Sequence, residues 1–384
     1  MFTGGGTGGH IYPILAVAEK LNKFSKEKNI DLNLHYIGAP ENYGEILAAN
    51  NIRVSKIVSA KIRRYLDIRN LIDIPKLFIS LIQAFWKVFF VMPDVLFSKG
   101  GPGALPIVLV CRFYNIPIII HESDSVAGLT NLLSSRYADK IGISFVSAQN
   151  SFVNYFKKES DKKKINDKIA LIGNPIRSFL TKEGSQENAK KIFGFDLQKP
   201  LILVICGSQG SVNVNDFFLN AARDLISENF QILHQTGIKN FDNFNKELNS
   251  IFPNLENDKS CYKAVPYFND NIKDAYIAAD IVVSRSGSGS IFEIATMAKP
   301  SILIPLADSA SDHQRKNAYE YANTGAAIVI EESNLKTNIF ISQLKKLFEN
   351  KENMSKMSEA AEKFSKTNSS EIIAEEIVKL GSRQ

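Results

Sequence analysis

Glycine-rich turns, each placed before a helical pattern, constrain the fold of this chain more than any other feature. The first turn, Gly4–Gly9, leads into residues 11–21, whose apolar positions recur at helical spacing. The second, 207–211, and the third, 285–290, each follow an apolar run typical of a buried strand. A glycine turn that opens onto a helix N-terminus exposes backbone N–H groups to diphosphate or another anion. Because such units occur in both halves of the chain, we expect two similar domains facing each other.

The segment before the first turn is short for such a unit. Only Met1, Phe2 and Thr3 precede Gly4, where a whole strand is expected, so we expect the first strand of the sheet to be missing. After the turn, we expect Pro13 in the first turn of the helix, where its lack of an N–H group costs nothing.

Apolar runs and helical patterns alternate along the chain, which predicts the α/β class with parallel sheets covered on both faces. The expected strands are 32–37, 54–57, 94–97, 116–121, 140–143, 169–171, 201–206, 231–235, 261–265, 281–284, 301–304 and 326–330. Three helices, near 338–349, 353–364 and 370–380, are expected to close the chain.

Length and composition exclude several classes of protein. The 384 residues suffice for two domains with separate cores. A net charge of +6 without aromatic-interleaved basic repeats favours a phosphorylated ligand or an anionic membrane surface, and we expect no nucleic-acid partner. The three cysteines are widely spaced, which predicts neither a disulfide framework nor a zinc site and indicates the reducing cytoplasm. No charged-then-apolar leader precedes the first glycine turn, so we expect no signal peptide.

Dinucleotide binding is the first alternative for the N-terminal turn, because Gly4, Gly6 and Gly9 match the spacing of that fingerprint. The fingerprint requires an acidic residue at the end of the second strand. Asp31 lies at the start of that expected strand instead, which disfavours NAD.

A strongly apolar helix is expected over residues 77–92. It is too short and too interrupted by polar residues for a membrane span of about 20 residues. One interpretation is a crossover helix buried against the sheet. The other adds a partly exposed apolar patch on an anionic bilayer. The basic residues beside that patch are Lys61, Arg63, Arg64, Arg69 and Lys76.

Two polar segments of the second half have the chemistry of a nucleotide-sugar site. In 284–293, hydroxyls and glycines gather at a helix start, where they could neutralise a leaving diphosphate. Glu293 lies one turn further on, where a carboxylate can bind both hydroxyls of a ribose; a simple helix N-cap series is the alternative. Gln314 and Asn317 are three residues apart on one helical face, and amides suit sugar hydroxyls.

In the first half, His121 and Glu122 follow a buried strand, at the edge where parallel sheets bind ligands. Either an acceptor-side role or a buried hydrogen-bonded pair fits them. The chain contains no Asp-x-Asp sequence, so we expect helix dipoles and Arg or Ser donors, rather than a metal ion, to hold a diphosphate. We expect no cofactor.

Several short motifs occur in one fixed order along the chain. They are Gly5–Pro13, Ser98–Gly101, His121–Glu122 with Ala127–Asn131, Gly173–Arg177, Gly207–Gly210, Arg285–Gly287 with Glu293, and Gln314 with Asn317. Together they closely resemble the MurG family of peptidoglycan N-acetylglucosaminyltransferases. The resemblance implies a GT-B fold, with two Rossmann-like domains facing across a cleft. Residues 1–175, with 366–384 packing back, would form the acceptor and membrane side, and 176–365 the UDP-GlcNAc side.

The resemblance also implies a reaction. GlcNAc would move from UDP-GlcNAc to the muramoyl 4-hydroxyl of lipid I, undecaprenyl-pyrophosphoryl-MurNAc-pentapeptide, giving lipid II with inversion at the anomeric carbon. The enzyme would be a peripheral protein on the inner, cytoplasmic leaflet of the cell membrane. A related transferase acting on diacylglycerol and an inactive nucleotide-sugar-binding module remain alternatives.

Site roles follow from the resemblance residue by residue. They are Thr7, Gly8 and Gly9 for the loop facing donor and acceptor phosphates; Arg177 and Ser208 for donor contacts; Asn269 for the backbone that reads uracil; Ser288, Gly289 and Ser290 for the diphosphate; Glu293 for the ribose; and Gln314 with Asn317 for the sugar.

The general base is the role with most candidates. His10 comes first, because it lies at the glycine turn and titrates near neutrality, and loop positioning is its alternative role. Asp124 and Glu122 are the other candidates. Asp124 stands where the family often has Asn, which places a second carboxylate beside the acceptor. The usual aromatic residue after Gly101 is replaced by Pro102.

Overall fold

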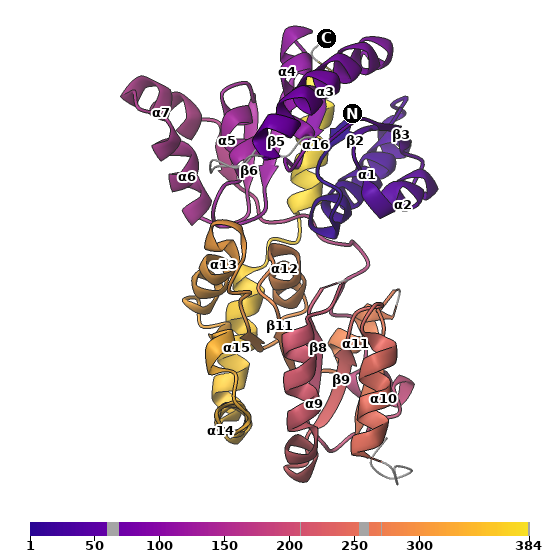
Figure 1. Cartoon of the computed structure of the whole chain (residues 1–384), viewed down its shortest axis with the longest axis vertical. Coiled ribbons are helices and arrows are strands. Elements are labelled where there is room, and N and C mark those ends of the chain that lie inside the picture. Colours follow the sequence, from indigo (N-terminus) through magenta and orange to yellow (C-terminus); the bar gives the residue numbers. More distant parts are fainter. Residues whose placement is uncertain (60–68, 208, 253–260, 270, 383–384) are drawn as a thin grey trace. The chain divides into compact units, whose positions relative to one another are not determined.

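The computed structural model describes residues 1–59, 69–207, 209–252, 261–269 and 271–382, without the side chains of 69–74. The chain divides into two compact units (Figure 1). The first comprises Met1–Arg177 and Lys366–Gln384, and the second comprises Ser178–Ser365.

A fully parallel seven-stranded sheet forms the first unit, in the order β3-β2-β1-β4-β5-β6-β7. Its strands are β1 Phe2–Thr3, β2 His35–Gly38, β3 Arg53–Lys56, β4 Leu96–Ser98, β5 Ile118–Glu122, β6 Lys140–Ile143 and β7 Ile169–Leu171. Its helices are α1 Gly8–Lys28, η1 Glu41–Tyr43, α2 Gly44–Ala49, α3 Arg69–Val91, α4 Ala104–Phe113, α5 Leu129–Ser135, α6 Ser147–Tyr155, α7 Glu159–Asn166 and α16 Ser369–Gly381.

The first strand is present, so the expectation that it is missing is wrong. Phe2 pairs with Tyr36 of β2 on one side and with Phe97 of β4 on the other, at the centre of the sheet. The Phe2 side chain is buried in a cluster shared with α1 and α16, which pack against each other. Two strand residues suffice because the pairing on both sides and this cluster hold them.

Helix α1 begins earlier than its proline suggested. The N–H groups of His10 and Ile11 already donate to the Thr7 carbonyl, at 3.0 and 3.1 Å. Pro13 therefore lies inside the helix rather than in its first turn, which corrects that expectation. Its missing N–H group leaves the carbonyl of Gly9 without the usual helical donor. Gly8 and Gly9 are the first residues of the helix, so the glycine turn and the helix are continuous.

The second unit is a fully parallel six-stranded sheet in the order β10-β9-β8-β11-β12-β13. Its strands are β8 Leu201–Ile205, β9 Gln231–Gln235, β10 Tyr262–Val265, β11 Ile281–Ser284, β12 Ser301–Leu303 and β13 Ala327–Val329. Its helices are α8 Gln186–Ile192, α9 Val212–Ser227, α10 Phe241–Ile251, α11 Ile272–Ala278, α12 Ser288–Thr296, η2 Ala310–Asp312, α13 His313–Ala322, η3 Glu332–Asn334, α14 Thr337–Glu349 and α15 Lys351–Phe364.

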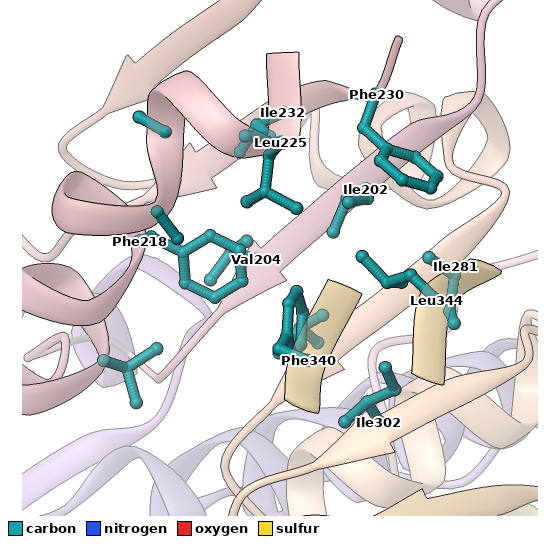
Figure 2. Packing of buried hydrophobic residues seen from close by; sticks show 14 of the residues in the cluster. Ile202, Val204, Phe218, Leu225, Phe230, Ile232, Ile281, Ile302, Phe340 and Leu344 are labelled. Carbon is teal, nitrogen blue, oxygen red and sulfur yellow. The ribbon is translucent and has the colours of Figure 1, made fainter. Parts of the chain in front are cut away.

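Aromatic and branched side chains fill the core of the second unit. Figure 2 shows Ile202 and Val204 of β8 beside Phe218 of α9 and Phe340 of α14. The two phenylalanine rings meet edge to face, with centroids 5.4 Å apart. Each fully buried ring of this kind contributes about 1.5–3 kcal/mol of hydrophobic free energy. This packing fixes β8 and β11, whose ends carry the glycine turns.

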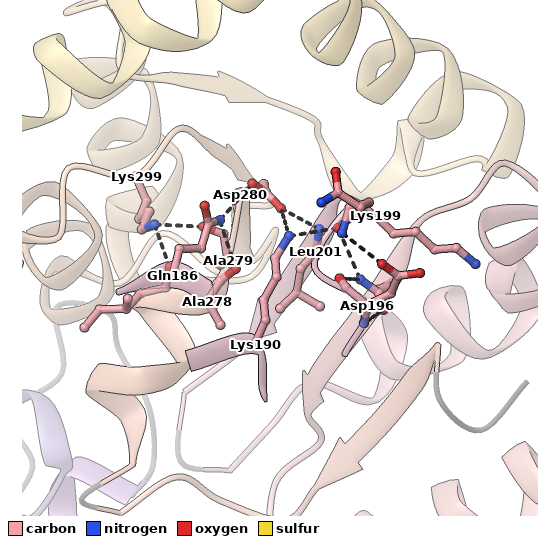
Figure 3. A network of polar contacts seen from close by, with 12 residues as sticks. Gln186, Lys190, Asp196, Lys199, Leu201, Ala278, Ala279, Asp280 and Lys299 are labelled. Atoms are coloured by element: carbon pink, nitrogen blue, oxygen red, sulfur yellow. Dashed lines mark hydrogen bonds and ion pairs between the residues drawn. The ribbon is translucent and has the colours of Figure 1, made fainter. Parts of the chain in front are cut away.

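A polar network at the opposite end of β8 closes the sheet (Figure 3). Asp280 accepts the N–H of Leu201 at 2.7 Å and pairs with the buried Lys190 ammonium at 3.1 Å. Lys190 also donates to the Lys199 carbonyl at 2.8 Å, and Gln186 donates to Asp280 at 2.9 Å. Every buried charge in this network has a partner, which is the condition for burying it.

The α/β class with parallel sheets is confirmed. All the expected strands are present, with boundaries that shift by up to three residues, and β1 is added to them.

Candidate functional site

The carboxyl edge of the second sheet holds most of the residues expected at a nucleotide-sugar site. Adjacent strands β8 and β11 end there, each in a glycine turn. Helix α12 starts at Ser288 directly after β11, with Gly287 in extended conformation as its N-cap. Its first N–H groups have no intrahelical acceptor, so they face outward with the positive end of the helix dipole.

Empty space lies next to this helix start. A Cβ atom added to Gly287, Gly289 or Gly207 would meet nothing within 4 Å. Ser288 is 5% exposed, and its buried hydroxyl finds no hydrogen-bond partner among the described residues. A helix N-terminus, free space and an unsatisfied buried hydroxyl together have the chemistry to bind an anion.

The Arg285 side chain binds groups of the protein itself and holds the glycine turn in place. Its guanidinium pairs with Glu332 at 2.6 Å and donates to Ser211 Oγ at 2.7 Å. It also donates to the carbonyls of Ile304 and Pro305, at 3.2 and 3.3 Å. Arg285 is 8% exposed, and its hydrogen bonds lower the pKa of Glu332 although partial burial acts in the opposite direction. One buried cation thus joins the loops after β8, β11, β12 and β13.

The two predicted sugar-binding amides differ in exposure. Asn317 is fully buried and donates to the Ser286 carbonyl at 3.2 Å. Gln314 is half-buried; its side-chain oxygen accepts the N–H of Leu306 at 3.1 Å, and its carbonyl accepts the hydroxyl of Ser286 at 2.8 Å. The structure therefore brings both residues to the glycine turn, with Asn317 beneath it.

The other predicted donor residues of the second unit that the structure describes lie on α12 and in the loop after β10. Glu293 is half-buried on α12 and accepts the Tyr276 hydroxyl at 3.2 Å. Asn269 is exposed, in the loop after β10. Ser290 is half-buried in the first turn of α12, and Ser208 lies outside the described residues.

The sequence did not single out Gln235, whose side chain joins the loop after β8 to the loop after β10. Its side-chain NH₂ donates to the Gly207 carbonyl at 2.8 Å, and its oxygen accepts the N–H of Phe268 at 2.9 Å. The side chain is buried at the end of β9. An amide at a predicted strand end, beside two predicted ligand loops, was the signal available.

In the first unit, the glycine turn and the start of α1 form the corresponding edge. Thr7 and Gly9 are exposed and Gly8 is half-buried. The Thr7 hydroxyl lies 2.8 Å from His10 Nδ1. Arg177 places its guanidinium over the ring of Tyr12, 5.4 Å from the centroid, on the same helix.

His10 is the titratable group at this turn. Burial first and the positive charge of Lys99 second lower its pKa to about 4, although Asp124 acts in the opposite direction. The expectation that His10 titrates near neutrality is therefore wrong. The imidazole is therefore neutral near pH 7 and can accept a proton. Asp124 is half-buried in the loop after β5, where its charge acts on both His10 and Lys99.

The Glu122 carboxylate is bound by hydrogen-bond donors of the protein. Its carboxylate accepts the N–H of Asp124 at 3.0 Å, the N–H of Gly128 at 2.9 Å and the side-chain NH₂ of Asn131 at 2.9 Å. Burial and the nearby charge of Asp124 raise its pKa, whereas these hydrogen bonds lower it. With both oxygens engaged, Glu122 holds the loop in shape, which favours His10 and Asp124 as the base.

The expected His121–Glu122 pair does not form, because successive strand residues point to opposite faces. His121 instead contacts Lys99, whose Nζ lies 2.5 Å from its Nδ1, and it donates from Nε2 to the Gly173 carbonyl at 2.8 Å. Burial and the charge of Lys99 hold the pKa of His121 well below its usual range.

Helix α3 is apolar on its outward side as well as on its buried side. Ser80, Ala84 and Val88 are fully buried, whereas large apolar side chains face outward. These outward residues, which we call the aromatic face, are Phe78, Ile79, Ile82, Trp86, Phe89 and Phe90, together with Met92 and, at the end of α4, Phe113. Trp86 is 55% exposed and Phe90 79%. Lys76 and Arg112 are exposed on the same two helices; Lys61, Arg63 and Arg64, and the side chain of Arg69, lie outside the described residues.

One side of this helix is buried on the unit, as the first interpretation expects, and the other side is the partly exposed apolar patch of the second interpretation. Within the part of the chain that the structure describes, no helix is both long enough and apolar enough to cross a membrane.

Comparisons with known proteins agree with this geometry. Residues 1–143 match the glycosyltransferase family 28 N-terminal domain, and residues 201–375 match its C-terminal domain. A solved structure of MurG from Acinetobacter baumannii covers 99% of this chain and 99% of its own, with a TM-score of 0.72 at 23% identity. A UDP-GlcNAc 2-epimerase from Neisseria meningitidis, solved with UDP-GlcNAc bound, gives 0.67 at 14% identity over 98% and 99% of the chains. The GT-B fold is confirmed.

Sequence relatives cover nearly the whole chain. A protein of Clostridium tetani is 34% identical over 92% of this chain and 90% of its own length. One of Legionella pneumophila is 33% identical over 92% and 89%. Both are named UDP-N-acetylglucosamine–N-acetylmuramyl-(pentapeptide) pyrophosphoryl-undecaprenol N-acetylglucosamine transferase. The chain belongs to this family of glycosyltransferases.

Proposed function

We propose that this chain transfers GlcNAc from UDP-GlcNAc to the muramoyl 4-hydroxyl of lipid I, giving lipid II. The observation that carries the proposal is the 34% identity over 92% of the chain to a relative of that name. The open, serine-lined start of α12 and the neutral His10 supply the chemistry that such a transfer requires.

The donor diphosphate binds at the start of α12. Backbone N–H groups and the hydroxyls of Ser288 and Ser290 stabilise the charge that develops as UDP leaves. Gly289 leaves room for the phosphates, because its missing Cβ would project into open space. Glu293, held by Tyr276, binds the ribose hydroxyls, the backbone at Asn269 reads uracil, and Gln314 contacts the sugar. Asn317, the other predicted sugar contact, is fully buried, and its role here is to support the turn through Ser286.

The acceptor is activated at the first glycine turn. The acceptor oxygen attacks the anomeric carbon while the bond from that carbon to the UDP oxygen breaks, and the bonding pair leaves with UDP. His10 takes the acceptor proton; when its Nδ1–H donates to Thr7, Nε2 is free to accept. Thr7, Gly8, Gly9 and Arg177 bind phosphate at this turn, where Arg177 supplies charge and Asp124 contacts the acceptor.

The aromatic face seats the protein on the inner leaflet of the cell membrane. Its rings contact one another along α3, as in Trp86 with Phe89 and Phe90. An exposed apolar patch of this size is rare on a protein that meets only water, and Lys76 and Arg112 add attraction to anionic lipid. The occupant proposed is the bilayer that carries the undecaprenyl chain of lipid I.

A transfer assay with paired acceptors tests the function. Purified protein receives labelled UDP-GlcNAc with either a lipid I analogue or diacylglycerol, and labelled lipid is separated by chromatography. Label in the lipid I product alone supports the proposal. Label in diacylglycerol alone would identify the related lipid glycosyltransferase, and donor binding without transfer would identify an inactive binding module.

A further inference from the structure

Lys99 is a buried cation whose hydrogen-bond partners are neutral groups. It follows β4 directly and is 3% exposed. Its Nζ lies 2.5 Å from His121 Nδ1, 2.5 Å from Ser123 Oγ and 3.5 Å from Asn174 Oδ1. Burying a charge is unfavourable unless its surroundings compensate, so this ammonium needs an explanation beyond packing.

The ammonium has no proton left for a ligand. It carries three N–H donors, and the imidazole, hydroxyl and amide each accept one. The Ser123 hydroxyl in turn donates a hydrogen bond to Asn174 Oδ1 at 2.9 Å. Lys99 therefore acts through its neighbours, and its bonds join the loops that follow β4, β5 and β7.

The same side chain lies against the glycine turn. The Lys99 N–H donates to the Thr3 carbonyl at 2.9 Å, and a Cβ added to Gly4 would lie 3.3 Å from Lys99 Cβ. Two residues later, a Cβ added to Gly101 would lie 3.0 Å from His10 Nε2. The segment that carries the buried charge thus runs directly beside the His10 imidazole.

We propose that Lys99 is a positioning residue of the acceptor side: its ammonium fixes the loop of Ser123 and Asp124 and sets a positive charge beside the His10 turn. The inference deepens the proposed function, because it explains how the base candidates are held and kept ready. It adds a residue to which the sequence assigned no role.

Two charged groups act on His10, and they have opposite signs. Lys99, at the end of β4, disfavours the imidazolium, whereas Asp124, in the loop after β5, favours it. Burial lowers the pKa of Lys99 to about 7, and the charges of Glu122 and Asp124 act against burial by stabilising the ammonium. Removing the lysine charge must therefore raise the pKa of His10, and removing the Asp124 charge must lower it.

The test follows the five histidines by NMR in the full-length protein, with resonances assigned by single substitutions. In Lys99→Met, the pKa of His10 rises by at least about 0.5 pH unit. In Asp124→Asn it falls. Lys140→Met, a surface lysine at the start of β6, leaves it unchanged. An unchanged His10 pKa in folded Lys99→Met would overturn the electrostatic part of the proposal.

A second measurement needs no variant. The ¹⁵N shifts of wild-type His121 should show the neutral tautomer with its proton on Nε2, because Nδ1 accepts from Lys99. The opposite tautomer would contradict the hydrogen bonds on which the proposal depends, even if Lys99→Met fails to fold.

Kinetics then separate positioning from general loss. We expect kcat of Lys99→Met to fall about 10- to 100-fold through misplacement of the acceptor side, with KM for UDP-GlcNAc unchanged. A matching rise in that KM would point to a general structural defect and count against the assignment. The NMR results do not require turnover, so a wild-type protein inactive on lipid I would refute the proposed function while leaving this inference testable.

Discussion

At the scale of single residues, the site depends on a few buried polar groups rather than on its exposed glycines. His10 is neutral because burial and Lys99 disfavour its charge, and Arg285 holds four loops of the second unit. We therefore expect substitution of His10 to affect turnover and substitution of Arg285 to affect stability.

Replacing His10 by alanine should reduce kcat at least about 100-fold, because the acceptor hydroxyl loses its general base. Steady-state transfer to a lipid I analogue measures the change. His35→Ala, in β2 away from the turn, serves as the control and should retain activity. Near-normal turnover of His10→Ala would remove the residue from the role and leave Asp124 as the base.

Replacing Arg285 by alanine should destabilise the second unit by about 3 kcal/mol, because Glu332 and two carbonyls lose a buried partner. The affinity for UDP-GlcNAc should fall with it, as measured by calorimetry. Arg315→Ala is the matched control, since it breaks an arginine–glutamate pair on an exposed surface of the same unit. Equal effects of the two substitutions would contradict the assigned role of Arg285.

At the scale of elements, α3 has the most unusual design. Its buried side packs on the core with apolar side chains such as Ala84 and Val88, and its outward side carries large rings where an ordinary surface helix carries polar residues. The proposed contact with the membrane accounts for these outward rings.

Trp86 is the single tryptophan of the chain and lies on the aromatic face, so its fluorescence reports membrane contact. We expect the emission to shift to the blue when vesicles rich in phosphatidylglycerol are added, and less with purely zwitterionic vesicles. The double variant Ile82→Ser and Phe90→Ser should lose the shift while its activity on a water-soluble acceptor remains. A wild-type spectrum that ignores both vesicle types would contradict membrane docking.

A buried histidine in β9 makes the stability of the second unit depend on pH. Burial lowers the pKa of His234 to about 3, and its ring lies between the Tyr262 hydroxyl, at 2.7 Å, and Asn215, at 3.1 Å. The unfolded chain protonates this histidine near pH 6.5, so it binds more protons than the folded chain below that pH. Stability of the second unit should fall by about 2 kcal/mol from pH 6.5 to 5 through this residue alone.

Hydrogen exchange of the β9 amides measures this loss within the second unit. The pH dependence should weaken in His234→Gln and persist in His35→Gln, which lies in the other unit. Identical dependence in all three proteins would exclude His234 as its source.

The sequence predicted elements better than their environments. Alternating apolar runs located every expected strand, because buried parallel strands leave an unmistakable pattern. The pattern did not predict the strand Phe2–Thr3, because two residues are too few to show it. This strand is held by pairing with β2 and β4 and by packing against α1 and α16. The buried roles of Lys99, Arg285 and Asn317 depend on contacts between distant loops, and no local signal encodes those.

At the scale of the whole molecule, one architectural device occurs twice. Each unit is a parallel sheet whose central strand ends in a glycine turn, and a helix start follows on that side. In the first unit the turn carries a neutral imidazole, and in the second the helix start carries serines and open space. The proposed division of labour is a base on one unit and a leaving-group site on the other.

That division predicts a single direct displacement, and the configuration of the product tests it most directly. UDP-GlcNAc carries its sugar in the α configuration, so GlcNAc on the muramoyl 4-oxygen should be β-linked. Proton NMR of the purified product distinguishes the two from the coupling at the anomeric hydrogen. A β-linked product is the result predicted here, and an α-linked product would contradict the central claim.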